Sequence, residues 1–111
     1  MIPHRAFFGN AEHDFRLELP QILELERSRD AGIGELSRRV MGSSYRLADL
    51  TETLRLALVG GGLDPQEAAA LVTAYLPMQP LEKTLTIAVD VLTELYFGAQ
   101  LPADDVAGEF A

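Results

Sequence analysis

Apolar residues recur at three- and four-residue intervals along most of the chain, which is the spacing of one face of an α-helix. The clearest case is a segment with Leu50, Leu54 and Leu58 on one side. Proline and glycine residues interrupt the pattern and divide it into separate segments, because proline favours helix starts and glycine favours helix ends. We expect five helices, at about residues 20–30, 33–41, 48–59, 65–76 and 80–97.

The N-terminal segment follows a different pattern, an alternation with period two. Phe15, Leu17 and Leu19 alternate with charged residues, as in a strand that has one buried face. A glycine–asparagine pair ahead of them supplies turn residues. We therefore expect a β-hairpin over residues 4–19. Its apolar face must lie on other elements, because a lone hairpin is marginal in water.

These elements predict a mostly α-helical fold of about five helices with an N-terminal β-hairpin, a small α+β single domain. The length of 111 residues is that of one domain with a modest core. We place this domain at residues 1–98. Residues 99–111 are small, acidic and interrupted by proline, so we expect them to form a flexible acidic tail.

The last predicted helix carries more apolar residues than one buried face needs. Ile87 and Val91 widen its main stripe to about half of the circumference. Such a helix is either central in the fold or presents one side to a partner, and we favour a central position. For the second alternative, Ile87, Val91 and Glu94 are the candidate partner-binding residues. The main stripe consists of Leu81, Leu85, Ala88, Leu92, Leu95 and Tyr96.

Three consecutive glycines, Gly60, Gly61 and Gly62, separate two of the predicted helices. Asp64 can accept hydrogen bonds from the free amides at the start of the second helix, and Pro65 suits its first position. A phosphate-binding loop would follow a strand and end in Gly-Lys-Ser or Gly-Lys-Thr. Here the glycines follow a helix and an acid comes next, so we interpret the segment as a structural turn.

The charge is −8 and unevenly distributed. Residues 1–46 hold equal numbers of basic and acidic residues, whereas residues 47–111 hold two basic and ten acidic residues. Such a surface repels nucleic acids and anionic membranes and attracts partners with basic segments. An acidic surface that serves only solubility is the alternative. The chain has no cysteine and no apolar run long enough to span a membrane, which fits a cytoplasmic protein.

The residues that could carry chemistry do not form a recognisable site. His13 lies between Glu12 and Asp14, but neighbouring residues of a strand point to opposite faces and do not converge on a metal ion. No serine has the context of an activated nucleophile. The helix–turn–helix outline lacks the basic residues of a DNA-reading helix. We therefore expect no catalytic, cofactor-binding or metal-binding residue, no nucleic-acid partner, and a protein that is not an enzyme.

Two segments resemble a known family. In the first, FRLELPQILELE, a strand ending in Phe-x-Leu leads into a helix. In the second, an aromatic residue, Tyr45, precedes a helix that ends in RLALVGGG, and a capped helix with an Ala-x-x-Leu-Val run and Tyr75 follows. Over about residues 7–97 this order resembles the small tail proteins of gene transfer agents and prophages, which are grouped with phage tail assembly chaperones. Pro20 departs from the family pattern.

The resemblance implies a role in building a phage-like tail. Tail assembly chaperones bind the tape measure protein, a long helical chain, until tube subunits polymerise around it. We therefore expect a tail assembly protein that binds the tape measure protein or other tail proteins. A minor tail component retained in the particle and a helical adaptor unrelated to tails are the alternatives. The label tail tube protein also occurs in the family, but a tube subunit is dominated by β-structure. Whether the hairpin edge pairs copies into a homo-oligomer stays open.

Overall fold

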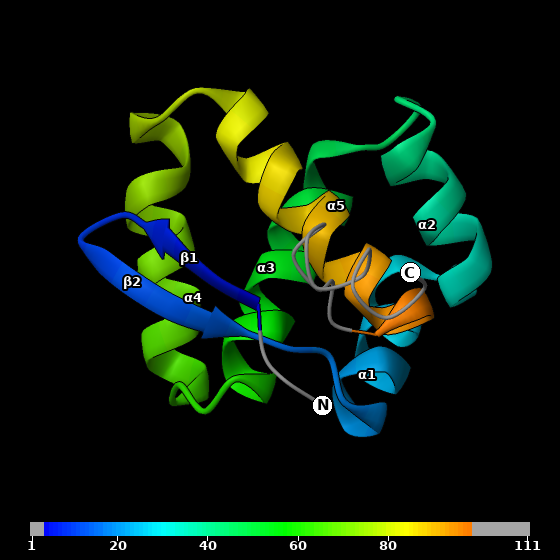
Figure 1. Ribbon diagram of the computed structural model, residues 1–111, viewed down its shortest axis with the longest axis horizontal. Helices are drawn as coiled ribbons and strands as arrows, with labels where there is room; N and C mark the ends of the chain where they lie inside the picture. Colours follow the sequence, from blue (N-terminus) through cyan, green and yellow to red (C-terminus); the bar gives the residue numbers. More distant parts are fainter. Residues whose placement is uncertain (1–3, 99–111) are drawn as a thin grey trace, which may run out of the picture.

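The computed structural model describes residues 4–98 and shows a two-stranded hairpin and five helices (Figure 1). This confirms the predicted fold class. The expected tail at 99–111 lies outside the described residues. The elements in order are β1 (His4–Phe8), β2 (Ala11–Phe15), α1 (Leu19–Arg29), α2 (Ile33–Met41), α3 (Leu47–Gly60), α4 (Pro65–Tyr75), the short 3-10 turn η1 (Leu76–Met78) and α5 (Leu81–Phe97).

The hairpin is antiparallel, with His4 opposite Phe15 and a two-residue loop that begins at Gly9. Gly9 has a φ of 71°, a conformation that glycine adopts without strain. The second strand ends at Phe15 and not at Leu19 as the alternation predicted. The reason is that the Arg16 amide donates to the Ala57 carbonyl of α3, at 2.9 Å, so the chain leaves the hairpin there. Leu19 opens α1 instead and is 66% exposed.

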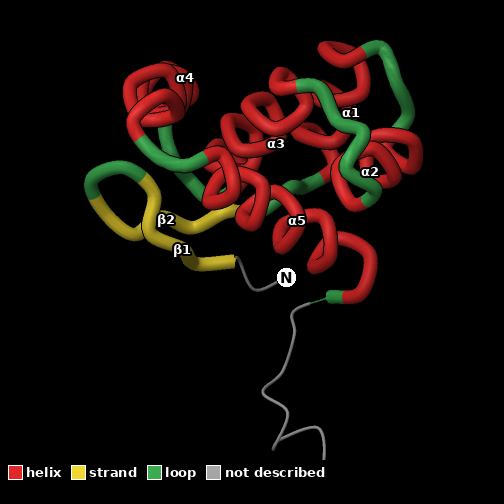
Figure 2. Tube along the Cα trace, turned by 90° about the horizontal axis from the view of Figure 1, so that it is seen from above, coloured by secondary structure: helices red, strands yellow, loops and turns green. Residues whose placement is uncertain are grey.

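Helix α3 is the centre of the fold. It contacts β2 and each of the other four helices. Figures 1 and 2 show the hairpin and α4 at one end of the molecule, α2 at the other end, and α3 and α5 between them. Leu50, Leu54 and Leu58 of α3 are fully buried, so the predicted apolar face of this helix is the one that packs.

The glycine segment joins α3 to α4 and also packs closely against the backbone of the hairpin and of the residue after it. A Cβ atom at Gly60 would lie 1.8 Å from the carbonyl oxygen of Arg16, and one at Gly61 would lie 2.0 Å from that of Asp14. Gly62 has open space around it but a φ of 114°. Two of the glycines therefore let the end of α3 approach the backbone of the hairpin strand, and the third allows the turn.

Helix α4 begins where the sequence pattern placed its cap. The Asp64 carboxylate accepts hydrogen bonds from the amides of Gln66, at 3.0 Å, and Glu67, at 3.2 Å, and Pro65 is the first helical residue. These bonds satisfy amides that have no partner inside the helix. At the other end of this helix, the Tyr75 ring packs on the hairpin turn, because a Cβ at Gly9 would lie 2.6 Å from it.

Helix α5 fully buries only part of the predicted stripe, Ala88 and Leu92, together with the two residues that widened it. The side chains of Leu81 and Tyr96 are exposed, whereas Ile87 and Val91 are only 4% and 2% exposed. The helix contacts α3, α2 and β1, so it is enclosed on more than one side, and this enclosure selects the buried face. The buried residues of α5 are Thr84, Ile87, Ala88, Val91 and Leu92.

One buried carboxylate connects three helices. The Asp49 side chain of α3 is wholly buried and accepts hydrogen bonds from the Arg29 guanidinium of α1, at 2.9 Å, and from the Arg46 amide, at 2.8 Å. Arg39 of α2 lies 3.6 Å from the same carboxylate. Burial alone would raise the pKa of Asp49, but these hydrogen bonds and positive charges outweigh it and hold the pKa below its usual value.

Candidate functional site

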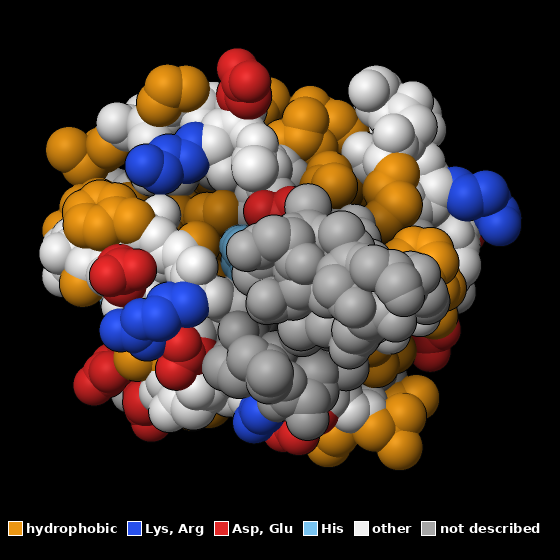
Figure 3. Space-filling model, viewed as in Figure 1, with side chains coloured by type: hydrophobic (Ala, Val, Ile, Leu, Met, Phe, Trp, Pro, Cys, Tyr) orange, Lys and Arg blue, Asp and Glu red, His pale blue; other side chains and the backbone are white. Residues whose placement is uncertain are grey.

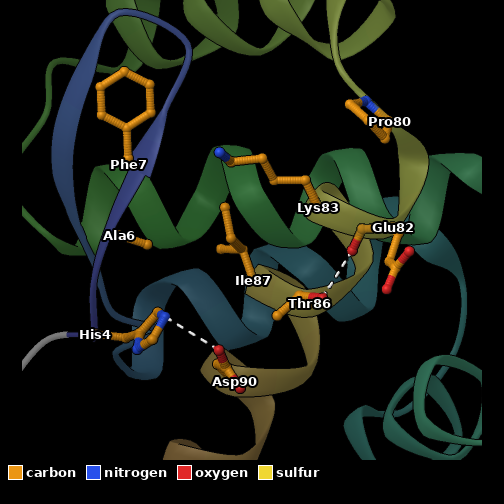
Figure 4. A pocket seen from close by; sticks show the side chains of 9 residues that line it. All are labelled: His4, Ala6, Phe7, Pro80, Glu82, Lys83, Thr86, Ile87 and Asp90. Atoms are coloured by element: carbon orange, nitrogen blue, oxygen red, sulfur yellow. Dashed lines mark hydrogen bonds and ion pairs between the residues drawn. The ribbon is translucent and has the colours of Figure 1, made fainter.

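An open groove of about 480 Å³ lies between β1 and the first turns of α5 (Figure 4). Its two walls come from opposite ends of the described chain, so it exists only because the hairpin packs beside the last helix. The lining residues are His4, Ala6 and Phe7 on β1 and Pro80, Glu82, Lys83, Thr86, Ile87 and Asp90 on α5 and just before it.

The periodicity of each element places these side chains. On β1, His4 and Ala6 share one face of the strand. Phe7 projects from the other face, and its exposed ring borders the groove beside Lys83. On α5, Lys83, Ile87 and Asp90 follow one another at four- and three-residue intervals, which puts them on one side of the helix. Figure 4 shows Ile87 between the two elements, where it forms an apolar floor.

One end of the groove is aromatic and cationic. Phe7 is 50% exposed, which is unusual for a large aromatic side chain. The amine of Lys83 lies 5.4 Å from the centroid of its ring, within the range of a cation–π interaction. This contact holds the Lys83 side chain across the mouth of the groove.

The other end is acidic around a histidine. Nε2 of His4 lies 3.4 Å from the Asp90 carboxylate, and Nδ1 lies 3.6 Å from the Glu94 carboxylate. The Asp90 side chain is 45% exposed and that of Glu94 is 15% exposed. Burial raises the pKa of Glu94 above its usual value, His4 opposes the rise, and Asp90 adds to it. Asp90 is therefore the acid that an incoming group can reach.

The candidate residues from the sequence lie at this site in part. Ile87 forms the groove floor, but at 4% exposure it is a core residue, and Val91 lies in the core without lining the groove. Helix α5 therefore has the central position that the sequence favoured, and the alternative in which Ile87 and Val91 present an exposed face to a partner is not the one observed. Glu94 reaches the groove through His4.

Sequence reasoning missed the residues that define the two ends of the groove. His4 and Phe7 lie far along the chain from Lys83 and Asp90, and no local spacing connects them. The one available signal was the uninterrupted stripe of Lys83, Ile87, Asp90 and Glu94 along a single side of the last helix.

Apolar side chains and recesses also occur elsewhere on the surface. On the face in Figure 3, apolar side chains reach the surface in separate groups between basic and acidic ones. One further apolar recess between α2 and α5 includes Met41, Tyr96 and Phe97. The glycine segment lies beside a recess that includes His13, whose Nε2 atom is buried without a hydrogen-bond partner among residues 4–98.

The described residues contain neither a candidate metal site nor a helix that could span a membrane. Within 4–98, no group of three or more histidine, cysteine or acidic side chains is placed to hold a metal ion. None of the helices in that part of the chain is long and apolar enough to cross a membrane.

The groove combines an aromatic wall, an apolar floor and separated charges, which are the features of a surface that binds another molecule.

A model of a known protein family matches most of the chain. The family model described as "Phage tail tube protein, GTA-gp10" matches residues 2–98. No curated protein and no solved structure shows significant similarity to the chain. Because the match covers most of its length, the chain belongs to this gene transfer agent and phage tail family.

Proposed function

We propose that this member of the gene transfer agent tail family is an assembly chaperone that binds the tape measure protein while a phage-like tail is built. It acts without enzymatic chemistry, in the cytoplasm, through reversible binding. The observation that carries the proposal is an open, partly apolar groove on a predominantly helical domain of a tail protein family.

The chemistry of the groove suits a helical client. A helical segment commonly binds by placing apolar side chains in a groove of its partner. The exposed Phe7 ring provides most of such a contact, and the nearly buried Ile87 closes the groove beneath it. The charge of −8 attracts basic segments and keeps the complex soluble.

Co-expression with the tape measure protein tests this proposal. The gene neighbourhood should supply the client, encoded beside the gene of this chain. We expect the two proteins to co-purify, and the client to move from the insoluble to the soluble fraction. A client that stays insoluble, with no complex formed, would refute the chaperone function.

The second candidate is a structural component that stays in the particle, and the words "Phage tail tube protein" in the family description favour it. Tube subunits join into rings through extensive β-structure, whereas residues 4–98 contain a single two-stranded sheet. This contrast supports the chaperone. Mass spectrometry of purified particles separates the two candidates, because a chaperone is absent from the finished tail and a component is present in it.

A further inference from the structure

We propose that the groove between β1 and α5 binds a partner segment in which an apolar side chain lies near a lysine or arginine. The apolar side chain packs on Ile87 beside Phe7, and the cation binds the Asp90 carboxylate. The inference rests on the proposed function for the idea that the protein works by binding another chain. It adds which surface binds and what chemistry that surface selects.

The apolar contact forms at the end of the groove that Phe7 and Lys83 define. Phe7 is half exposed on the wall, and Ile87 lies at the floor opposite it (Figure 4). The contact of the Lys83 amine with the Phe7 ring holds Lys83 at the rim, so its aliphatic stem borders the same end of the groove. A side chain of intermediate size that enters here removes from water mainly the surface of the Phe7 ring and of the Lys83 stem, because Ile87 is only 4% exposed.

The distribution of charge along the groove determines where a basic side chain of the partner binds. Asp90 faces the groove with nearly half of its side chain in solvent, and the less exposed Glu94 lies behind His4. Lys83 is seven residues earlier on α5, about 10 Å away along the helix axis. A cation of the partner is therefore repelled from the Lys83 end and attracted to the Asp90 end, which fixes the end of the groove at which the cation binds.

A second copy of the chain fits this groove poorly. Each copy carries a charge of −8, and the side of α5 that lines the groove presents the acids Glu82 and Asp90 together with Lys83. The net negative charge of both copies opposes their association, whereas a basic segment neutralises the Asp90 end. The charge pattern therefore selects a basic partner.

Peptide selection on the purified full-length protein tests this inference without using the tape measure protein. The probe is a random-peptide phage-display library, and the enriched peptides are synthesised and their affinities measured by fluorescence polarisation. We expect the enriched sequences to share an apolar residue and a lysine or arginine. We also expect their affinity to fall as salt is raised.

Two pairs of matched variants locate the binding site. Thr86 lines the groove and its hydroxyl donates to the Glu82 carbonyl of its own helix, so Thr86→Arg fills the groove without removing a core contact. It should lower affinity by about tenfold or more, whereas Thr73→Arg, at an exposed position of α4 outside the groove, adds the same charge and should have little effect. Asp90→Asn should lower affinity by about threefold, and Glu67→Gln on α4 should not.

The outcomes separate this inference from the proposed function. Peptides that bind Thr86→Arg as tightly as the wild type, or enriched peptides without basic residues, would overturn the inference, as would a selection that enriches nothing. Circular dichroism confirms that each variant is folded. If the tape measure protein co-purifies equally with the wild type and with Thr86→Arg, the chaperone function stands and the groove assignment fails. If peptides bind in the groove but the tape measure protein does not co-purify, the chaperone function fails and the inference stands.

Discussion

The three consecutive glycines should respond differently to the same substitution. Gly60 and Gly61 lie against the carbonyl oxygens of Arg16 and Asp14, whereas Gly62 lies in open space with a positive φ. Alanine at the first two positions therefore meets backbone atoms of β2 and of the residue that follows it, which cannot rotate away. Alanine at Gly62 meets no atom within 4 Å but has to adopt a φ of 114°.

The structure sets the size of each effect. Real Cβ atoms stay at least 3.0 Å from such an oxygen, so the strand must move by about 1.2 Å to relieve the 1.8 Å contact at Gly60. The movement also strains the hydrogen bond from the Arg16 amide to the Ala57 carbonyl, which contributes about 1 kcal/mol. We expect Gly60→Ala and Gly61→Ala to lower the free energy of unfolding by about 3 kcal/mol each. Gly62→Ala should cost about 1–2 kcal/mol from backbone strain.

Thermal unfolding followed by circular dichroism measures these differences. A loss of about 3 kcal/mol should lower the Tm by about 12–20 °C in a domain of this size. The control is Gly34→Ala in α2, where the nearest atom to an added Cβ is 4.0 Å away. Because alanine favours helix, this control should raise stability by about 0.5 kcal/mol. A Tm of Gly60→Ala equal to that of the wild type would refute the close approach of α3 to the hairpin.

Three further substitutions test the core, a helix cap and the buried carboxylate, each by urea unfolding. Val91→Ala should lower the free energy of unfolding by about 2 kcal/mol, because it leaves a cavity beside α3; an unchanged midpoint would mean that Val91 is not in the core. Asp64→Ala should cost about 1 kcal/mol through the loss of two capping bonds. Asp49→Asn should cost about 2 kcal/mol, because Arg29 loses a charged partner while the Arg46 amide keeps an acceptor. Because the pKa of Asp49 is lowered in the folded state, its ionised carboxylate stabilises the wild type fully at pH values above the ordinary pKa of about 3.9. This stabilisation is lost as the pH falls through the lower pKa of the folded state, so Asp49→Asn should lose less stability than the wild type in that acid range. Equal losses would refute the ion pair.

Features set by neighbours in sequence were predictable. The hairpin loop needs a residue tolerant of positive φ, the start of α4 needs an acceptor such as Asp64, and the face of α3 needs apolar residues three or four positions apart. Each requirement involves residues within one turn of a helix or one loop, so single residue types reveal it. The five helices and the hairpin follow from these local rules.

Features set by packing were not predictable in the same way. Most positions of α5 are apolar or small, so its periodicity allows more than one buried face, and the enclosure by α3, α2 and β1 makes the choice. The end of β2 depends on a hydrogen bond to Ala57. The buried Asp49 was indistinguishable in sequence from an acid on an exposed face, because its partner Arg29 is on another helix. The groove likewise requires contact between the two ends of the described chain.

The hairpin connects the glycine segment with the groove, and this connection can be tested. The hairpin forms one wall of the groove through Phe7, and its other strand rests on Gly60 and Gly61. A displacement of β2 by about 1 Å at Gly61 is carried to β1 through the register that pairs Arg5 with Asp14 and Phe7 with Glu12. Gly61→Ala should therefore weaken binding of a groove peptide severalfold at temperatures where the variant is fully folded, although no atom of Gly61 lines that groove.

The comparison with Gly62→Ala makes this prediction specific. That variant strains the turn but leaves the strand in place, so it should lose stability without losing affinity. Fluorescence polarisation well below both melting temperatures measures the two affinities with the same peptide. Equal affinities for Gly61→Ala and the wild type would show that the position of β1 does not depend on the packing of β2 against Gly61. The groove would then depend on α5 and the His4 contacts rather than on the glycine segment.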